Sequence, residues 1–175
     1  MAEYPQQLVQ HRVLFDGTPV TIRPIRPDDS GMEQEFVRHL SENSRYNRFM
    51  GTLRELPPKK LKQFTDIDYE RHMAYIATVV REGSEMEIGV ARYVATEKPG
   101  NCEFAITVDD AWQGTGVAGL LMAALQRSAR QRGFKTMEGL VLSSNRKMLK
   151  FSRQLGFSFH REPGEGDVVH IELPL

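Results

Sequence analysis

The stretch Gln113–Gln126, QGTGVAGLLMAALQ, places Gly114, Gly116 and Gly119 at the spacing G-x-G-x-x-G. Apolar residues follow at helical offsets until Gly133. A glycine turn before a helix gathers backbone N–H groups at the positive end of the helix dipole, where an anion binds well. The stretch therefore predicts a phosphate-binding turn at the start of a long helix, with Gly119 as a close-packing position in the first helical turn. A turn that only caps the helix is the alternative that it leaves open.

A nicotinamide or flavin enzyme is the first interpretation of this spacing. Its fold requires the first glycine at the end of a strand and, about 20 residues later, an acid at the end of the next strand. Glu138 lies at that distance, but apolar residues 139–142 follow it, so it belongs to the start of its strand. Polar residues 109–113 also separate the preceding strand from Gly114, and no Lys-Ser or Lys-Thr follows the glycines as in a Walker loop. The pattern therefore favours a pyrophosphate outside these two cofactor classes.

Strands and helices alternate along the chain without an internal repeat. The Asp16-Gly17 pair predicts a tight hairpin, and three consecutive apolar runs predict an antiparallel meander before the glycine turn. The expected fold class is therefore α/β (α+β), with a mixed, mostly antiparallel central sheet and helices on both faces. The predicted strands are residues 13–15, 20–25, 73–80, 87–96, 102–108, 136–142, 157–161 and 168–173. The predicted helices are residues 27–40, one or two short helices within 41–65, residues 117–133 and residues 145–155.

The composition restricts the class of protein. With 175 residues, the chain is expected to form one domain, residues 1–175, that buries its own core. Its 23 basic and 23 acidic residues cancel, so its charge favours neither a nucleic acid nor an acidic membrane surface as partner. The N-terminus lacks a signal-peptide pattern and the apolar run 73–80 is too short to span a bilayer, which favours the cytoplasm. The single Cys102 and five scattered histidines predict no disulfide and no metal site.

Two motifs resemble those of the GNAT superfamily of acetyltransferases. The segment Q-G-T-G-V-A, from Gln113 to Ala118, is similar to the family's Arg/Gln-x-x-Gly-x-Gly/Ala loop. Residues 145–157, NRKMLKFSRQLGF, resemble the family's asparagine-containing helix that ends in Gly-Phe. Similarity to the bacterial Pat-type protein-lysine acetyltransferases covers nearly the whole chain. It is carried by LFDGTPVTIRPIRPDD (14–29), SENSRYNRFM (41–50), FTDIDYERHMAYIA (64–77) and EFAITVDDAWQGTG (103–116).

The resemblance implies acetyl-CoA as cosubstrate, without a metal, and gives nine residues a role. Val108 would pair through its main chain with the pantetheine arm of CoA, and Asn145 would approach the same arm. Glu103 lies where Pat-type enzymes place their general base. Many relatives carry a tyrosine as general acid in the last helix, and Ser152 occupies that position here, so either water or Ser152 itself is expected to protonate the departing thiolate. The pyrophosphate is expected on Gln113, Gly114, Thr115, Gly116, Val117 and Ala118.

The expected reaction is direct transfer from the thioester to an amine, without a covalent acyl-enzyme. A free lysine has a pKa of about 10.4, so a base must take its proton at neutral pH. Glu103 is the acid at the start of the strand before the glycine turn, and a solvated glutamate without a role is the alternative. Cys102 is interpreted as a small buried residue, because no base accompanies it in the sequence. Lys147 and Lys150 are either contacts to CoA phosphates or ordinary surface lysines.

The leading functional hypothesis is acetyl-CoA-dependent acetylation of the ε-amine of a protein lysine. By family resemblance, an acyl-CoA synthetase is the expected type of target. Acetylation of a small-molecule amine and a catalytically silent acyl-CoA-binding module are the alternatives. Residues 41–71, which combine arginines, aromatic residues and acids, are expected on the acceptor side. No nucleic acid or membrane partner is expected, and a homodimer is left open as the assembly.

Overall fold

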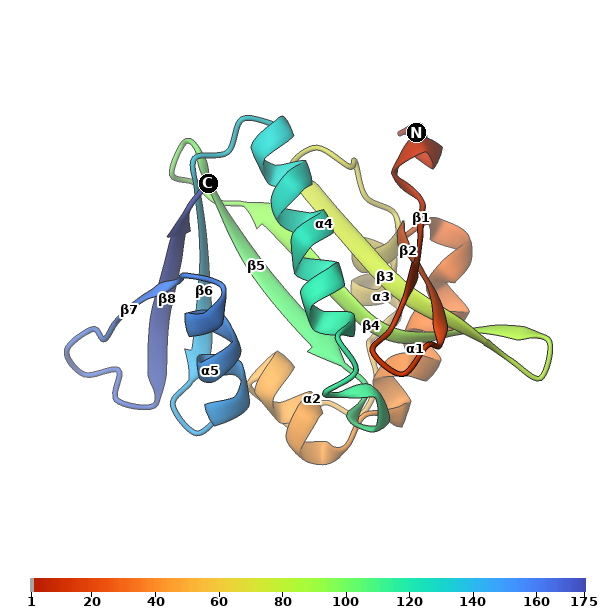
Figure 1. Ribbon diagram of the computed structural model, residues 1–175. Helices are drawn as coiled ribbons and strands as arrows, with labels where there is room; N and C mark the ends of the chain where they lie inside the picture. The colour runs from red at the N-terminus through yellow and green to blue at the C-terminus, as the bar shows by residue number, and fades with distance from the viewer. Residues whose placement is uncertain (1) are drawn as a thin grey trace.

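An eight-stranded sheet forms the centre of the computed structural model, which describes residues 2–175 (Figure 1). The strands lie in the order β1-β2-β3-β4-β5-β6-β8-β7. All neighbours are antiparallel except β5 and β6, so the mixed, mostly antiparallel sheet expected from the sequence is confirmed. The strands are β1 (Gln10–Val13), β2 (Pro19–Pro24), β3 (His72–Arg81), β4 (Ser84–Ala95), β5 (Asn101–Val108), β6 (Thr136–Leu142), β7 (Ser158–His160) and β8 (Val168–Pro174).

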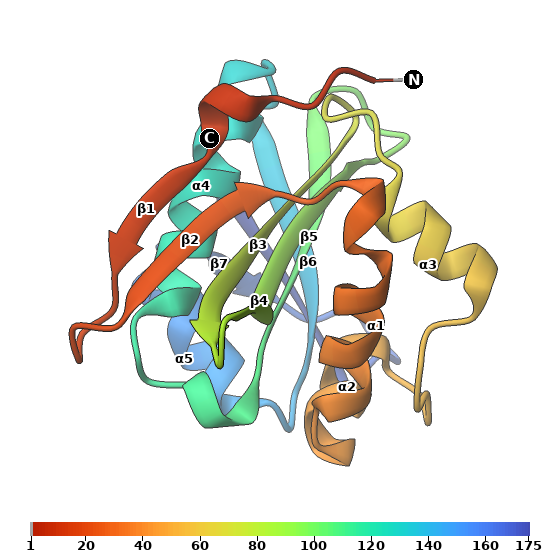
Figure 2. The ribbon, with the colours of Figure 1, turned by 90° about the vertical axis from the view of Figure 1, so that its right-hand side faces the viewer.

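Helices cover both faces of the sheet, as the sequence also predicts. The view in Figure 2 shows α4 and α5 on one side of the strands and α1, α2 and α3 on the other. Pro57 and Pro58 separate the second and third helices, since α3 begins at Pro58. The α-helices are α1 (Ser30–His39), α2 (Glu42–Phe49), α3 (Pro58–Thr65), α4 (Val117–Gln131) and α5 (Arg146–Gln154). Three short 3-10 segments are η1 (Gln6–Leu8), η2 (Pro27–Asp29) and η3 (Asp110–Trp112).

The long helix α4 packs along the middle of the sheet. Its apolar side chains recur at helical spacing, and Leu121, Met122 and Leu125 are fully buried against β3, β4 and β5. Ser128 on the same face forms a 2.7 Å hydrogen bond with the Tyr75 hydroxyl, so this buried polar pair is satisfied. This packing fixes the start of α4, and with it the glycine turn, against the end of β5.

The one parallel pair, β5 and β6, separates partway along its length. Its pairing runs only from Asn101–Thr136 to Glu103–Glu138, whereas β6 remains paired with β8 as far as Leu142. Beyond the last pair, the Phe104 ring lies over Gly139. A Cβ added to Gly139 would lie 2.7 Å from this ring. Figure 1 shows the two strands diverging toward the end of the sheet that α2 and α5 flank. A fork therefore opens in the sheet beyond Glu103.

Charged side chains are buried on the side of the sheet that faces α1 and α3. Arg92 of β4 donates to the Glu33 carboxylate at 3.3 Å and to the Phe64 carbonyl at 3.1 Å. It also lies 2.9 Å from His72 Nε2, and burial, followed by the Arg92 charge, lowers the pKa of His72 to about 4. His72 is therefore a neutral acceptor at neutral pH. Burial, followed by the Glu33 charge, raises the pKa of the Glu87 carboxyl well above its usual range.

Candidate active site

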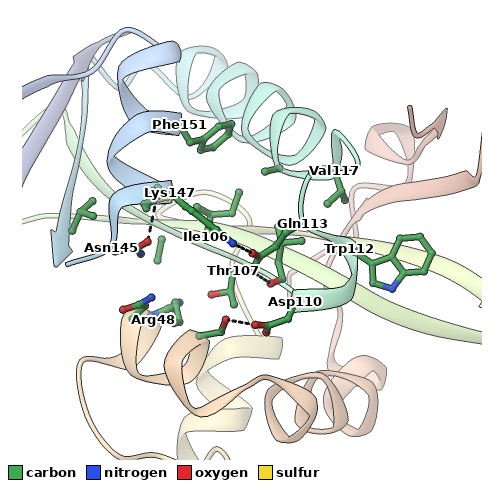
Figure 3. Close-up of a pocket in the computed structure, with 18 of the residues that line it drawn as sticks. Arg48, Ile106, Thr107, Asp110, Trp112, Gln113, Val117, Asn145, Lys147 and Phe151 are labelled. Atoms are coloured by element: carbon green, nitrogen blue, oxygen red, sulfur yellow. Dashed lines mark hydrogen bonds between the residues drawn. The ribbon is translucent and has the colours of Figure 1, made fainter. Parts of the chain in front are cut away.

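A pocket of about 740 Å³ lies in the fork between β5 and β6. Its walls come from both faces of the sheet: the start of α4 and helix α5 on one side, and helix α2 on the other (Figure 3). Residues 104–108 of β5 form one edge, and Leu140 and Val141 of β6 line the opposite edge. The pocket therefore connects two faces of the molecule through the sheet, so that two reactants can approach from different sides.

The glycine turn lies at the α4 end of this pocket. Gly114 has φ +80° and Gly116 has φ +94°, values that side-chain-bearing residues rarely adopt. Gly116 is the N-cap of α4, where no side chain caps the helix and no acid occupies the first turn. The N–H groups of the first helical turn therefore have no acceptor within the helix. They form the positive end of the helix dipole. This geometry suits a phosphate group.

The turn is held from behind by residues distant in sequence. The Thr115 hydroxyl donates to the Trp112 carbonyl at 2.6 Å, and the Thr115 carbonyl accepts from the Phe15 N–H at 3.0 Å. The Phe15 ring packs so closely on Gly116 that an added Cβ would lie 2.9 Å from it. Phe15 lies between β1 and β2 and is 86% exposed, yet it lines the pocket. The first hairpin thus supports the anion-binding turn.

Side chains from the turn and from α5 meet across the pocket. Lys147 Nζ donates to Gln113 Oε1 at 3.3 Å, and Gln113 Nε2 donates to the Val108 carbonyl at 3.4 Å (Figure 3). The Asn145 side chain accepts from the Met148 N–H at 3.2 Å and so caps α5. Its oxygen thus accepts one bond within the helix, and its amide nitrogen has no partner among residues 2–175 and can donate to a ligand. Lys147 lines the pocket beside the turn, whereas Lys150 does not line it.

The exposed edge of β5 offers main-chain groups to the pocket. Residues 104–108 pair with β4 on one side, through the register Phe104–Tyr93 to Val108–Gly89. On the other side β6 has diverged, so the peptide groups of β5 that point there have no strand partner among residues 2–175. An extended ligand with amide groups can take the place of the missing strand.

Glu103 lies at the last in-register pair before the fork, opposite Glu138 of β6. Its side chain is exposed and does not line the pocket. Because residues two apart on a strand share a face, Glu103 lies on the same face as Ala105 and Thr107, which do line it. The structure therefore places this carboxylate beside the pocket, in contact with water.

Seven of the nine residues assigned by resemblance line the pocket, namely Val108, Gln113, Gly114, Gly116, Val117, Ala118 and Asn145. Glu103 and Thr115 lie beside it. The prediction that Gly119 is a close-packing position is wrong, because an added Cβ there would meet nothing within 4 Å. Ser152 is fully buried, does not line the pocket and donates to the Met148 carbonyl at 2.8 Å. The structure therefore does not support Ser152 as a proton donor to a thiolate.

Two lining residues were not found from the sequence. Phe15 and Trp112 line the pocket from segments far apart in the chain. An aromatic residue directly before the Asp16-Gly17 turn was the only indication of Phe15. Arg48 belongs to residues 41–71, the region expected on the acceptor side, and it lines the pocket from α2.

Cys102 is buried in the core at 0% exposure, as the sequence predicts, and burial raises the pKa of its thiol to about 12. The thiolate is the reactive form of cysteine, so the native thiol is expected to resist alkylation at pH 8. Intact-mass measurement after treatment with iodoacetamide should show no adduct on the folded protein during the time in which a denatured sample reacts fully. Rapid labelling of the folded protein at the same pH would contradict this assignment.

Within residues 2–175, no group of three or more His, Cys, Asp or Glu side chains is arranged to hold a metal ion. Of the helices in that part of the chain, none combines the length and the apolar character needed to cross a membrane.

Comparison with known proteins gives consistent results. Residues 20–158 match the family described as Acetyltransferase (GNAT) domain. The acetyltransferase PA5475 of Pseudomonas aeruginosa is 39% identical over 162 residues, which cover 93% of this chain and 87% of that protein. The crystal structure of the GNAT domain of S. lividans PAT superposes with a TM-score of 0.89 at 32% identity, covering 99% of this chain and 100% of that one. The structure of yncA from Salmonella typhimurium, solved with its cofactor acetyl-CoA, has a TM-score of 0.67 at 19% identity and covers 89% and 94% of the two chains.

Proposed function

This chain belongs to the GNAT family of acetyltransferases, and on that premise we propose that it transfers the acetyl group of acetyl-CoA to the ε-amine of a protein lysine. The observation that carries the proposal is the pocket in the β5–β6 fork. It joins an anion-binding helix start on one face of the sheet to a second opening at α2 on the other. Cosubstrate and acceptor can therefore meet at the edge of β5 from opposite sides.

Acetyl-CoA is the cosubstrate that this arrangement fits. We assign its pyrophosphate to the turn Gln113–Ala118, where N–H groups and the helix dipole favour an anion. The amides of the pantetheine arm would pair with the free edge of β5 up to Val108, and the amide nitrogen of Asn145 would donate to the same arm. Lys147, already on the pocket wall beside Gln113, adds a positive charge at the phosphate end. The solved neighbour that contains acetyl-CoA supports this choice of cosubstrate.

The proposed reaction is one direct displacement. The amine nitrogen forms a bond to the thioester carbonyl carbon, giving a tetrahedral oxyanion, and the carbon–sulfur bond then breaks to release CoA thiolate. We assign Glu103 as the base that accepts the amine proton. Because its carboxylate lies beside the pocket and is exposed, a water molecule is the expected link between the two. Solvent water is also the proton source that we assign to the departing thiolate, because Ser152 faces the core.

The choice of a protein acceptor rests on two observations. The opening at α2 is lined by Asn43, Ser44 and Asn47, polar side chains at the protein surface that a projecting lysine can pass. The neighbour with a TM-score of 0.89 is the GNAT domain of S. lividans PAT, and the resemblance to Pat-type proteins implies a protein lysine as acceptor. An acyl-CoA synthetase is the first protein acceptor that we propose to test.

The experiment incubates the protein with acetyl-CoA and candidate acceptors while thiol release and acetylated residues are measured. We expect the label on specific lysines of a folded protein, located by mass spectrometry, and no label on the same protein when acetyl-CoA is omitted. Turnover with free amines alone would replace the protein acceptor by a small molecule. Thermal stabilisation by acetyl-CoA without transfer to any acceptor would indicate a binding module and overturn the proposed activity.

A further inference from the structure

The pocket contains an arginine whose hydrogen-bond donors are unused. Arg48 lies in the last turn of α2 and lines the pocket on the side opposite α4. Among residues 2–175, no carboxylate or carbonyl oxygen accepts a hydrogen bond from its guanidinium. The Cζ atom of Arg48 lies over two aromatic rings, 4.8 Å from the Phe49 centroid and 5.7 Å from that of Phe64. These contacts leave the N–H groups in its plane free.

Three other arginines of the fold have acceptors. Arg23 is buried and forms two hydrogen bonds with the Asp29 carboxylate, at 2.7 and 2.8 Å. Arg92, also buried, has Glu33 and the Phe64 carbonyl as acceptors. Arg45, on the same helix as Arg48, donates to the carbonyls of Arg38 and Leu40. Arg48 differs from these three, and its N–H groups are available to a ligand in the pocket.

A second unused polar group lies in the same pocket. Thr107 of β5 is 8% exposed, lines the pocket, and its hydroxyl has no hydrogen-bond partner. It shares its strand face with Ala105 and Glu103, the face against which α2 packs. Arg48 and Thr107 therefore reach the pocket from adjoining elements on the same side of the sheet, and Figure 3 labels both at that end.

No carboxylate touches Arg48 among residues 2–175. Burial, followed by the charge of Arg92, lowers the pKa of Arg48 to about 10, and the charges of Glu33 and Glu103 oppose this shift. The CoA pyrophosphate is assigned to the glycine turn on the other face. An anion bound by Arg48 would therefore belong to the acyl group or to the acceptor.

We propose that Arg48 and Thr107 form a carboxylate-binding subsite within the pocket, so that the enzyme prefers a substrate that carries a carboxylate close to the reacting centre. A guanidinium presents parallel N–H groups that match the two oxygens of a carboxylate, and a hydroxyl can donate a third bond. The carboxylate belongs either to the acyl chain, as in malonyl- or succinyl-CoA, or to the acceptor, as an acidic residue beside the lysine. This inference rests on the proposed function for the placement of the two substrates.

The first part of the test identifies the source of the carboxylate. Isothermal titration calorimetry compares the binding of acetyl-CoA with that of succinyl-CoA, and the binding of two lysine peptides that differ only by Glu or Gln beside the lysine. We expect at least one acidic probe to be preferred by about tenfold or more. Equal values for both pairs of probes would overturn the subsite. The titrations require no turnover, so a protein that transfers nothing to any amine would sink the proposed function and still give an answer here.

The second part tests whether the two side chains cause the preference. Arg48→Met should abolish the preference for acidic probes and change the values for the neutral probes little. Arg48→Lys should keep part of the preference. Arg45→Met, on the same helix, should leave the preference intact. Thr107→Val keeps the shape of a buried side chain and should fold normally, with a loss of preference of roughly threefold to tenfold. It keeps the proposal testable if Arg48→Met unfolds. Equal losses for acidic and neutral probes would mean that Arg48 is only structural.

Discussion

Glu103→Gln is expected to lower kcat for acetyl transfer by about 10²- to 10⁴-fold, the usual contribution of a positioned general base. The amide has nearly the same shape as the carboxylate but cannot accept the amine proton. Because Glu103 is exposed and lies outside the pocket wall, the dissociation constant of acetyl-CoA and the melting temperature should stay close to those of the parent. Stopped assays of thiol release give kcat, and titration calorimetry gives the dissociation constant.

The deficit of this variant should depend on pH. As the pH rises toward about 10.4, a growing fraction of lysine is already deprotonated and no longer needs a base. The ratio of parent to variant rates should therefore decrease between neutral and alkaline pH. A ratio that stays constant over this range, or a variant as fast as the parent at pH 7, would remove Glu103 from the mechanism.

Glu138→Gln provides the matched control. Glu138 is the in-register partner of Glu103 on β6, and its side chain accepts a hydrogen bond from Asn101 at 3.1 Å. Glu103 has no such partner among residues 2–175, so it is the freer of the two acceptors. The control substitution should change kcat much less than Glu103→Gln does. The opposite order would transfer the role of base to the neighbouring strand.

Local patterns were sufficient to predict most of the fold. The Asp16-Gly17 turn, the apolar runs of the meander and the periodic helix after Gly116 are all determined by residues near one another in sequence, and each of these elements is present. The first strand was misplaced, because β1 is Gln10–Val13 and the predicted residues 14 and 15 belong to the turn. The start of β4 at Ser84, three residues earlier than expected, was missed because its first residues are exposed and polar. The order of the strands in the sheet was not predicted from the sequence, because the pairing of β6 with β5 and β8 depends on contacts between distant segments.

The site was only partly predictable for the same reason. Spacing identified the glycine turn, and the family resemblance identified the residues around it. The Phe15 contact behind Gly116 depends on tertiary packing, which no local pattern records. Gly119 was misjudged because its role was inferred from the glycine spacing, whereas a side chain at Gly119 would meet open space. The burial of Ser152 against the core likewise follows from how α5 packs.

Gly116→Ala is expected to weaken acetyl-CoA binding by about tenfold or more, for two separate reasons. A residue with a side chain at φ +94° costs about 1–2 kcal/mol in backbone strain, so the turn would relax away from the geometry that directs its N–H groups into the pocket. The new Cβ would also lie 2.9 Å from the Phe15 ring, which must move and release the hairpin support. Titration calorimetry with acetyl-CoA measures the loss.

Two further variants separate these causes. Gly133→Ala has a similar φ of +88° and open space around the added Cβ, but it lies beyond the far end of α4. It should lower the melting temperature about as much as the strain in Gly116→Ala does, and leave acetyl-CoA affinity unchanged.

Adding Phe15→Ala to Gly116→Ala removes the ring that the Cβ would strike. If the clash contributes, the double variant loses less free energy of acetyl-CoA binding than the sum of the losses in Phe15→Ala and Gly116→Ala. If Gly116→Ala binds acetyl-CoA as tightly as the parent does, the pyrophosphate cannot depend on this turn, and the placement of the cosubstrate in the fork is wrong.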